Sequence, residues 1–202
     1  MLKHLILDLG GVLINFDPTD YIKTLGLDED TSLLLKQSIC SDPLWGEMDY
    51  GVYPTPQDYV PLFIAHYPSL KEEIISFFNG PWMESIYTPL LSNLSLLDYA
   101  QDHHLDYYIL SNFSMDGTAF LKSHYDFIKN AKGSLFSSDI KMRKPNKNMF
   151  ELFFKTFKLN KEECLFIDDF KENINMASTL AIPTHLFKDI HETIDYLNQY
   201  LK

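Results

Sequence analysis

Three carboxylates follow short apolar segments of the sequence, and together they have the chemistry of a metal site. Asp8 comes directly after residues 4–7, and Asp168 and Asp169 come directly after residues 165–167. If both segments are parallel strands, their carboxyl ends meet at one edge of the sheet and bring the carboxylates together. Such a cluster is unfavourable unless a cation neutralises it. Because oxygen ligands suit a hard ion that also binds phosphate, the predicted cofactor is Mg²⁺.

The same cluster has the residue types needed for phosphoryl transfer. A carboxylate beside Mg²⁺ can attack a phosphoryl group and form an aspartyl-phosphate, so Asp8 is the candidate nucleophile. The transferring oxygens then need hydrogen-bond donors and a cation, for which Ser111 and Lys144 are candidates. Pro145 keeps Lys144 away from helical geometry. Each signal alone is weak, because an Asp after a strand is usually a turn residue or a cap, but the ordered set is more specific.

Apolar segments alternate with segments of helical periodicity, which predicts an α/β fold with a doubly wound parallel sheet. Strands buried on both faces are short and almost wholly apolar. The expected strands are residues 4–7, 105–110 and 165–167, with weaker candidates at 134–137 and 183–187. The expected core helices are residues 89–104, 148–158, 171–180 and 189–201.

An early part of the chain departs from this alternation. Residues 17–88 contain no convincing buried strand and are punctuated by prolines, while residues 32–38, 58–66 and 70–78 have the pattern of short helices. We therefore expect a helical cap domain at 17–88, inserted into a core domain formed by residues 1–16 and 89–202. The bland interpretation of its many aromatic residues is a small core, and the sharper one is that Trp45 and Tyr50 stack on a sugar ring.

The composition limits the class of partner. The chain has 202 residues, a net charge of -11 and a pI of about 4.9. An acidic surface disfavours nucleic acid and anionic membranes, so we expect a small-molecule substrate bound by local positive charge or a metal. The two Cys are far apart, the first residues are not typical of a signal peptide, and no apolar stretch is long enough to span a membrane. These features favour a cytoplasmic monomer or small homo-oligomer.

Four ordered motifs of the chain resemble those of the haloacid dehalogenase (HAD) superfamily. They are Asp8–Leu13, Leu110–Asn112, Arg143–Pro145, and Phe166–Asp169 followed by Asn173. The resemblance extends from Asp8 to about Phe187, and the early helical insertion is similar to the type-one cap of that superfamily. Within it, the opening motif and the segment from Trp45 to Gly51 resemble the bacterial sugar-phosphate phosphatases that include α-D-glucose-1-phosphate phosphatase.

The resemblance implies a role for each matching position. Asp8 matches the nucleophile, which is also a metal ligand. The other implied metal ligands are the backbone carbonyl of Gly10 and the acidic pair Asp168 and Asp169, either of which is a candidate for direct ligation. The positions implied to bind phosphate are Ser111, Asn112 and Lys144, and Asn173 matches a supporting position.

One position departs from the common phosphatase pattern. Most phosphatases of the superfamily have a second Asp two residues after the nucleophile, which protonates the leaving group and later activates water, and here that position is Gly10. The interpretation we favour is an active enzyme in which another group or water replaces this acid, with Asp17, Glu47 and Asp49 as candidate substitutes. A leaving group as acidic as an anomeric hydroxyl would reduce the need for it.

Two alternatives stay open on the sequence. The first is a weak or inactive module that binds phosphate and metal, although the retained Asp8, Lys144 and acidic pair argue against complete decay. The second is a 2-haloacid dehalogenase, which also forms an ester on its first Asp and lacks the second. Dehalogenases of this superfamily need no metal, so Asp168 and Asp169 make this second alternative the weaker one.

Overall fold

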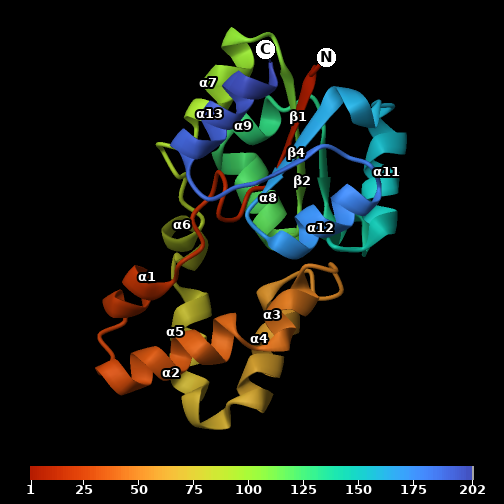
Figure 1. Ribbon diagram of the computed structural model, residues 1–202. Coiled ribbons are helices and arrows are strands. Elements are labelled where there is room, and N and C mark those ends of the chain that lie inside the picture. The colour runs from red at the N-terminus through yellow and green to blue at the C-terminus, as the bar shows by residue number, and fades with distance from the viewer. Residues whose placement is uncertain (202) are drawn as a thin grey trace.

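A parallel β-sheet forms the centre of the computed structural model, which describes residues 1–201 (Figure 1). It has five strands in the order β3-β2-β1-β4-β5, and every neighbouring pair is parallel. The strands are β1 (His4–Leu7), β2 (Asp106–Ser111), β3 (Ser134–Phe136), β4 (Cys164–Asp168) and β5 (Thr184–Leu186). The chain builds outward from β1 on one side and then returns to add β4 and β5 on the other. The predicted doubly wound α/β fold is confirmed.

Helices cover both faces of the sheet. In Figure 1, α7 (Ser95–Asp102) and α13 (Ile190–Tyr200) lie on one side, and α11 (Lys147–Phe157) and α12 (Lys171–Thr179) on the other. The remaining core helices are α8 (Met115–His124), α9 (Asp126–Lys129), α10 (Ser137–Ile140) and the 3-10 turn η2 (Lys161–Glu163). Within residues 1–201, no helix has both the length and the apolar character that a membrane span requires.

The alternation of side chains along the strands divides the core in two. Leu5 and Leu7 of β1 pack with the apolar side chains under α7 and α13, whereas Ile6 between them packs with those of α11. All three are almost wholly buried. This follows from the period of two along a strand, and it explains why β1 is apolar throughout rather than alternating with polar residues.

A group of helices separates β1 from α7 in the chain and forms a distinct lobe beside the sheet in Figure 1. It comprises α1 (Thr19–Thr24), α2 (Glu29–Cys40), α3 (Pro43–Met48), α4 (Pro56–His66), the 3-10 turn η1 (Pro68–Leu70), α5 (Lys71–Asn79) and α6 (Trp82–Ile86). Tyr59, Phe63 and Phe77 are fully buried within the lobe and contact further aromatic rings. Most of the aromatic residues of this segment therefore form a small core, which is the blander of the two interpretations above.

Among the expected core boundaries that differ from the structure, those of the helix at 89–104 and of β2 bear on the site. The helix expected at 89–104 begins only at Ser95, because Pro89 forms an antiparallel bridge with Ile14 and the Leu90 amide donates to the Leu13 carbonyl. The segment 89–94 thus returns the chain from the helical lobe to the core. In addition, β2 includes Ser111, so this polar residue is the last residue of the strand and is fixed by the ladder to β3.

Candidate active site

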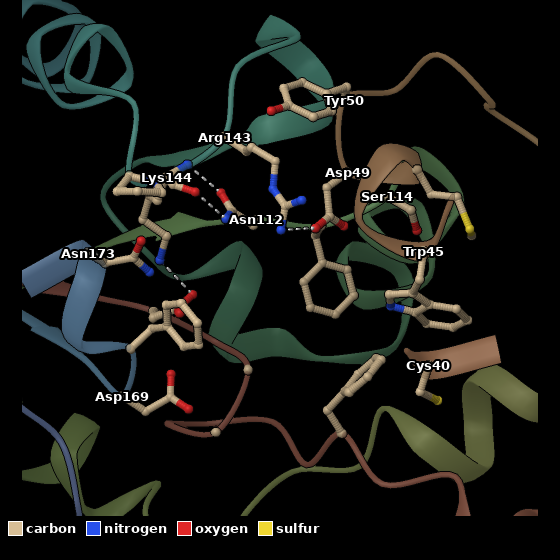
Figure 2. A pocket seen from close by; sticks show the side chains of 18 of the residues that line it. Cys40, Trp45, Asp49, Tyr50, Asn112, Ser114, Arg143, Lys144, Asp169 and Asn173 are labelled. Carbon is tan, nitrogen blue, oxygen red and sulfur yellow. Dashed lines mark hydrogen bonds and ion pairs between the residues drawn. The ribbon is translucent and has the colours of Figure 1, made fainter. Parts of the chain in front are cut away.

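The carboxyl ends of β1, β2 and β4 meet beside a cavity of about 910 Å³, which lies between the sheet and the helical lobe (Figure 2). Asp8 directly follows β1, Ser111 ends β2, and Asp168 ends β4. Because β1 lies between β2 and β4, the three residues are neighbours in space although about 160 positions separate them in the chain. The structure therefore brings together the polar residues that follow the predicted strands.

The three predicted carboxylates form one cluster. Oxygen atoms of Asp8, Asp168 and Asp169 all lie within 4.8 Å of one another. Asp8 and Asp168 are buried, whereas Asp169 is exposed to the cavity. Gly11 makes room for Asp169, because a Cβ atom at this position would collide with the Asp169 carboxylate. Gly11 also has a φ of +69°, which glycine adopts most readily.

A buried lysine lies between two of these carboxylates. The Lys144 ammonium is 2.6 Å from Asp168 Oδ2 and 3.0 Å from Asp8 Oδ1, and the lysine side chain has no exposed surface. Burial alone would lower the pKa of Lys144, but the charges of Asp8 and Asp168 raise it above its ordinary value. Burial raises the pKa of Asp8 to about 7, an effect that Asp168 reinforces and Lys144 opposes.

Hydrogen bonds fix the orientation of each charged group. The Ser111 hydroxyl and the Leu9 amide donate to Asp8 Oδ1 at 2.6 and 2.7 Å. The Asn112 side chain exchanges two hydrogen bonds with the Lys144 backbone, at 2.8 and 3.0 Å. Asn112 therefore positions the loop that carries Lys144, and Ser111 orients the candidate nucleophile.

Asp168 has the most complete set of partners in the cluster. The Phe170 amide donates to its Oδ1 at 2.8 Å, the Asn173 side-chain amide lies 3.0 Å from both of its oxygens, and Lys144 donates to Oδ2. Asp169 receives no such donors from other residues in the part of the chain described. The Asn173 side-chain oxygen is buried and has no hydrogen-bond partner within residues 1–201.

The wall that faces the sheet residues comes from the helical lobe and the adjoining loops. Asp49, directly after α3, forms an ion pair of 3.3 Å with Arg143, which also donates to the Gly46 carbonyl at 3.0 Å. Trp45 and Tyr50 both line the cavity, as the sharper interpretation of these aromatic residues requires. Figure 2 shows Asp49 and Asp169 on opposite sides of the cavity.

Arg143 is the residue at this site whose contacts the sequence did not reveal. It precedes Lys144 in the third motif, but its partners belong to a segment almost 100 positions earlier in the chain. Gly46 is a signal of this contact in the sequence, because a side chain there would collide with the Arg143 guanidinium.

Comparison with solved structures identifies the fold. A HAD family enzyme from Bacteroides thetaiotaomicron, solved in complex with magnesium and inorganic phosphate, matches with a TM-score of 0.70 at 21% identity, covering 93% of this chain and 95% of that chain. A HAD-like family hydrolase from Porphyromonas gingivalis matches with a TM-score of 0.70 at 18% identity, covering 100% of this chain and 98% of that chain. The L-2-haloacid dehalogenase of Xanthobacter autotrophicus, with chloropropionic acid covalently bound, matches with a TM-score of 0.66 at 15% identity, covering 91% and 76%.

The chain therefore has the fold of the HAD family enzymes, as its four motifs predicted. No protein-family model matches the chain. Among curated proteins, drimenol cyclase drtB of Aspergillus calidoustus is 27% identical over 191 residues, which is 93% of this chain and 34% of the relative. The chain thus spans about a third of that relative's length. The finer resemblance to sugar-phosphate phosphatases stays a prediction.

Proposed function

We propose that this protein is a Mg²⁺-dependent phosphatase of the HAD superfamily, which hydrolyses a small phosphorylated metabolite through an aspartyl-phosphate on Asp8. The sequence resemblance favours a sugar phosphate as the substrate class. The observation that carries the proposal is the arrangement at the cavity. Buried Lys144 neutralises part of a carboxylate cluster, and the Asp169 carboxylate of the same cluster is exposed to the cavity.

The charges and donors of the cluster fit a divalent cation. Three carboxylates and one ammonium leave two formal negative charges, which one Mg²⁺ ion would balance. The unpartnered, buried oxygen of Asn173 beside Asp168 is a further acceptor without a donor. The related structure solved with magnesium and inorganic phosphate has the same fold, which supports the fit.

We assign the metal ligands from the same contacts. The ion would be held by Asp8, the Gly10 backbone carbonyl and Asp169. Asp168 would not ligate it directly, because its oxygens already accept hydrogen bonds from Lys144, Asn173 and a backbone amide. This favours Asp169 over Asp168 as the directly ligating member of the pair. When bound, the ion supplies positive charge that neutralises the carboxylates and the transferring phosphoryl oxygens.

The residues of the chain then have distinct tasks in the reaction. Ser111 and the Leu9 amide hold Asp8 in one orientation, so that its second oxygen is free to attack phosphorus. Lys144 offers its ammonium to the phosphoryl oxygens, and Asn112 keeps the Lys144 loop in position. Phosphate would be bound by Ser111, Asn112 and Lys144 together. Water finally cleaves the aspartyl-phosphate.

The helical lobe would select the substrate. We propose residues 17–88 as a cap domain on a core of residues 1–16 and 89–202, with Trp45 and Tyr50 on the cap side of the cavity. Closure over the phosphorylated substrate would exclude bulk water from the reaction. We also propose a cytoplasmic location and no nucleic-acid or membrane partner, in keeping with the acidic composition.

The carboxylate cluster disfavours the dehalogenase alternative. A 2-haloacid carries a carboxylate of its own, which Asp168 and Asp169 would repel without a cation between them. A phosphate monoester is attracted once the cation is present. The cluster therefore supports phosphatase activity over halide release.

A phosphatase screen with Mg²⁺ tests the proposal. Wild-type protein is expected to release inorganic phosphate from at least one sugar or small-metabolite monoester, to lose this activity in EDTA, and to recover it with added Mg²⁺. Asp8→Asn is expected to fall to the background of a buffer blank, whereas the exposed Asp30→Asn keeps wild-type turnover. Equal turnover in wild type and Asp8→Asn would remove Asp8 from the mechanism. Binding of Mg²⁺ and phosphate without turnover would favour the inactive module, and halide release in EDTA the dehalogenase.

A further inference from the structure

The reaction proposed above lacks a proton donor at its usual position. Gly10 carries no side chain, and a Cβ atom added to it would meet no other atom within 4 Å, so neither an acid nor a close substitute fills that space within residues 1–201. A poor leaving group needs a proton as the P–O bond breaks, and water needs a base when it attacks the phosphoenzyme. Another side chain around the cavity would have to do both.

Two of the three carboxylates considered from the sequence are unsuitable. Asp17 is exposed, accepts hydrogen bonds from Lys36 and Thr19, and is absent from the residues that line the cavity. Those hydrogen bonds lower the pKa of Asp17 to about 2, so it carries no proton near neutral pH. Glu47 is exposed and does not line the cavity either.

Asp49 differs from both in its location. It lines the cavity, its side chain is only 16% exposed, and Arg143 holds its carboxylate at 3.3 Å. Figure 2 shows it on the cap side, beside Arg143 and facing the interior that Lys144, Asn112 and Asp169 border from the core side. In-line attack by Asp8 places the leaving group on the side of phosphorus opposite Asp8, and Asp49 belongs to the wall of the same cavity.

The electrostatics of Asp49 suit proton transfer. Burial raises the pKa of Asp49 to about 7, although the charges of Arg143 and Lys144 oppose the rise. Lys144 also lies 3.0 Å from Asp8, so the same ammonium acts on both carboxylates. Tyr87, a further titratable group beside Asp49, has a pKa raised by burial and stays neutral. A carboxyl group that titrates near neutral pH is matched to general acid–base catalysis.

We propose that Asp49 is the catalytic acid and base of the reaction, supplied from the helical lobe in place of the residue missing at position 10. The inference rests on the proposed phosphatase activity. In the first step an Asp8 oxygen bonds to phosphorus, the bond from phosphorus to the leaving oxygen breaks, and the Asp49 carboxyl proton passes to that oxygen. In the second step Asp49 takes a proton from water, the water oxygen bonds to phosphorus, and the bond to Asp8 breaks. Phosphate leaves, Asp8 is again a carboxylate, and Asp49 is again protonated.

Leaving-group dependence distinguishes this role from a structural one. Asp49→Asn is expected to lose roughly 10²-fold or more of the turnover of an alkyl monoester such as β-glycerophosphate, the range of general acid catalysis. The same variant should still transfer the phosphoryl group of p-nitrophenyl phosphate, whose leaving group needs no proton. Because the base for the second step is gone, p-nitrophenol should then appear as a burst equal to the enzyme concentration, followed by slow turnover.

Matched variants complete the test. Glu47→Gln, at an exposed position of α3 two residues before Asp49, is expected to behave as wild type. Arg143→Met breaks the ion pair and keeps the carboxyl group, so it should show neither the burst nor the selective loss on the alkyl monoester. Since an aspartate at position 10 would meet no atoms near its Cβ, Gly10→Asp combined with Asp49→Asn should restore alkyl monoester turnover.

The outcomes separate this inference from the proposed function. If wild type hydrolyses monoesters with Mg²⁺ but Asp49→Asn loses both substrates equally and shows no burst, Asp49 is not the acid and base. The same conclusion follows if Arg143→Met, which keeps the Asp49 carboxyl group, reproduces every effect of Asp49→Asn, because loss of the ion pair alone would then account for those effects. If wild type hydrolyses no monoester and Asp8→Asn changes nothing, the phosphatase proposal itself fails.

Discussion

Removing the buried ammonium of Lys144 is a demanding test of the charge arrangement at this site. Lys144→Met replaces a buried lysine with an unbranched apolar side chain one atom shorter, and Asp168 loses a cation 2.6 Å away. At an effective dielectric constant of about 20, two opposite charges at that distance attract by about 6 kcal/mol before desolvation is counted. The variant therefore leaves a carboxylate buried without the charge that balances it.

Protonation limits the size of this penalty. An ordinary aspartate has a pKa of about 3.9, so forcing a proton onto it costs about 4 kcal/mol at pH 7 and about 1.5 kcal/mol at pH 5. At pH 7 the cost of protonation, about 4 kcal/mol, is smaller than the lost attraction of about 6 kcal/mol, so the folded variant binds a proton at the buried carboxylate. When the pKa of a carboxyl group is higher in the folded state than in the unfolded state, the folded protein becomes less stable as the pH increases above the unfolded pKa. We therefore expect metal-free Lys144→Met to be destabilised by about 3–5 kcal/mol at pH 7 and by about half of that or less at pH 5.

Urea unfolding in EDTA at the two pH values measures this effect, with intrinsic fluorescence of the two Trp as the probe. Lys155→Met, on the exposed face of α11, is the matched control and should unfold as wild type does. Equal midpoints for the two variants at pH 7 would refute the reasoning, because the ammonium would then carry no stabilising charge. A penalty that is the same at pH 5 and pH 7 would show lost packing rather than a lost ion pair.

Three further predictions concern the groups around this ion pair. Gly11→Ala should weaken Mg²⁺ binding by calorimetry, since the new Cβ displaces the Asp169 carboxylate and strains a φ of +69°; unchanged affinity would remove Asp169 from the metal site. Asn173→Ala should lower the free energy of unfolding by about 1–3 kcal/mol, because buried Asp168 loses its amide donor; an unchanged urea midpoint would contradict this. For an alkyl monoester, kcat/KM should fall above about pH 7 as Asp49 loses its proton, and this decline should be absent in Asp49→Asn.

The fold and the meeting of the polar residues Asp8, Ser111 and Asp168 could be predicted from the sequence because both depend on a regular pattern. Buried parallel strands are short apolar runs, and the residues that follow them share one edge of the sheet. Asp8, Ser111 and Asp168 follow or end three such runs, and the structure has β1, β2 and β4 side by side. No knowledge of side-chain packing was needed for this step.

The side of the site formed by the helical lobe could not be predicted in the same way, because it depends on contacts between distant segments. Asp17, Glu47 and Asp49 look alike in sequence, and only burial against Arg143 separates the third from the others. Helix α8 was not foreseen, although Ser114 accepts from the Gly117 amide as a typical N-cap does. Its apolar residues are few and interrupted by polar ones, which weakens the periodic signal.

Trapping the phosphoenzyme tests the central claim most directly. Wild-type protein mixed with Mg²⁺ and p-nitrophenyl phosphate, quenched in acid and digested, should give a peptide containing Asp8 that carries one added phosphoryl group by mass spectrometry. The signal should be stronger in Asp49→Asn, where hydrolysis of the intermediate is slowed, and absent from Asp8→Asn. A phosphoryl group on any other residue would contradict the account. So would full activity of Asp8→Asn together with the absence of a modified peptide from the wild-type protein.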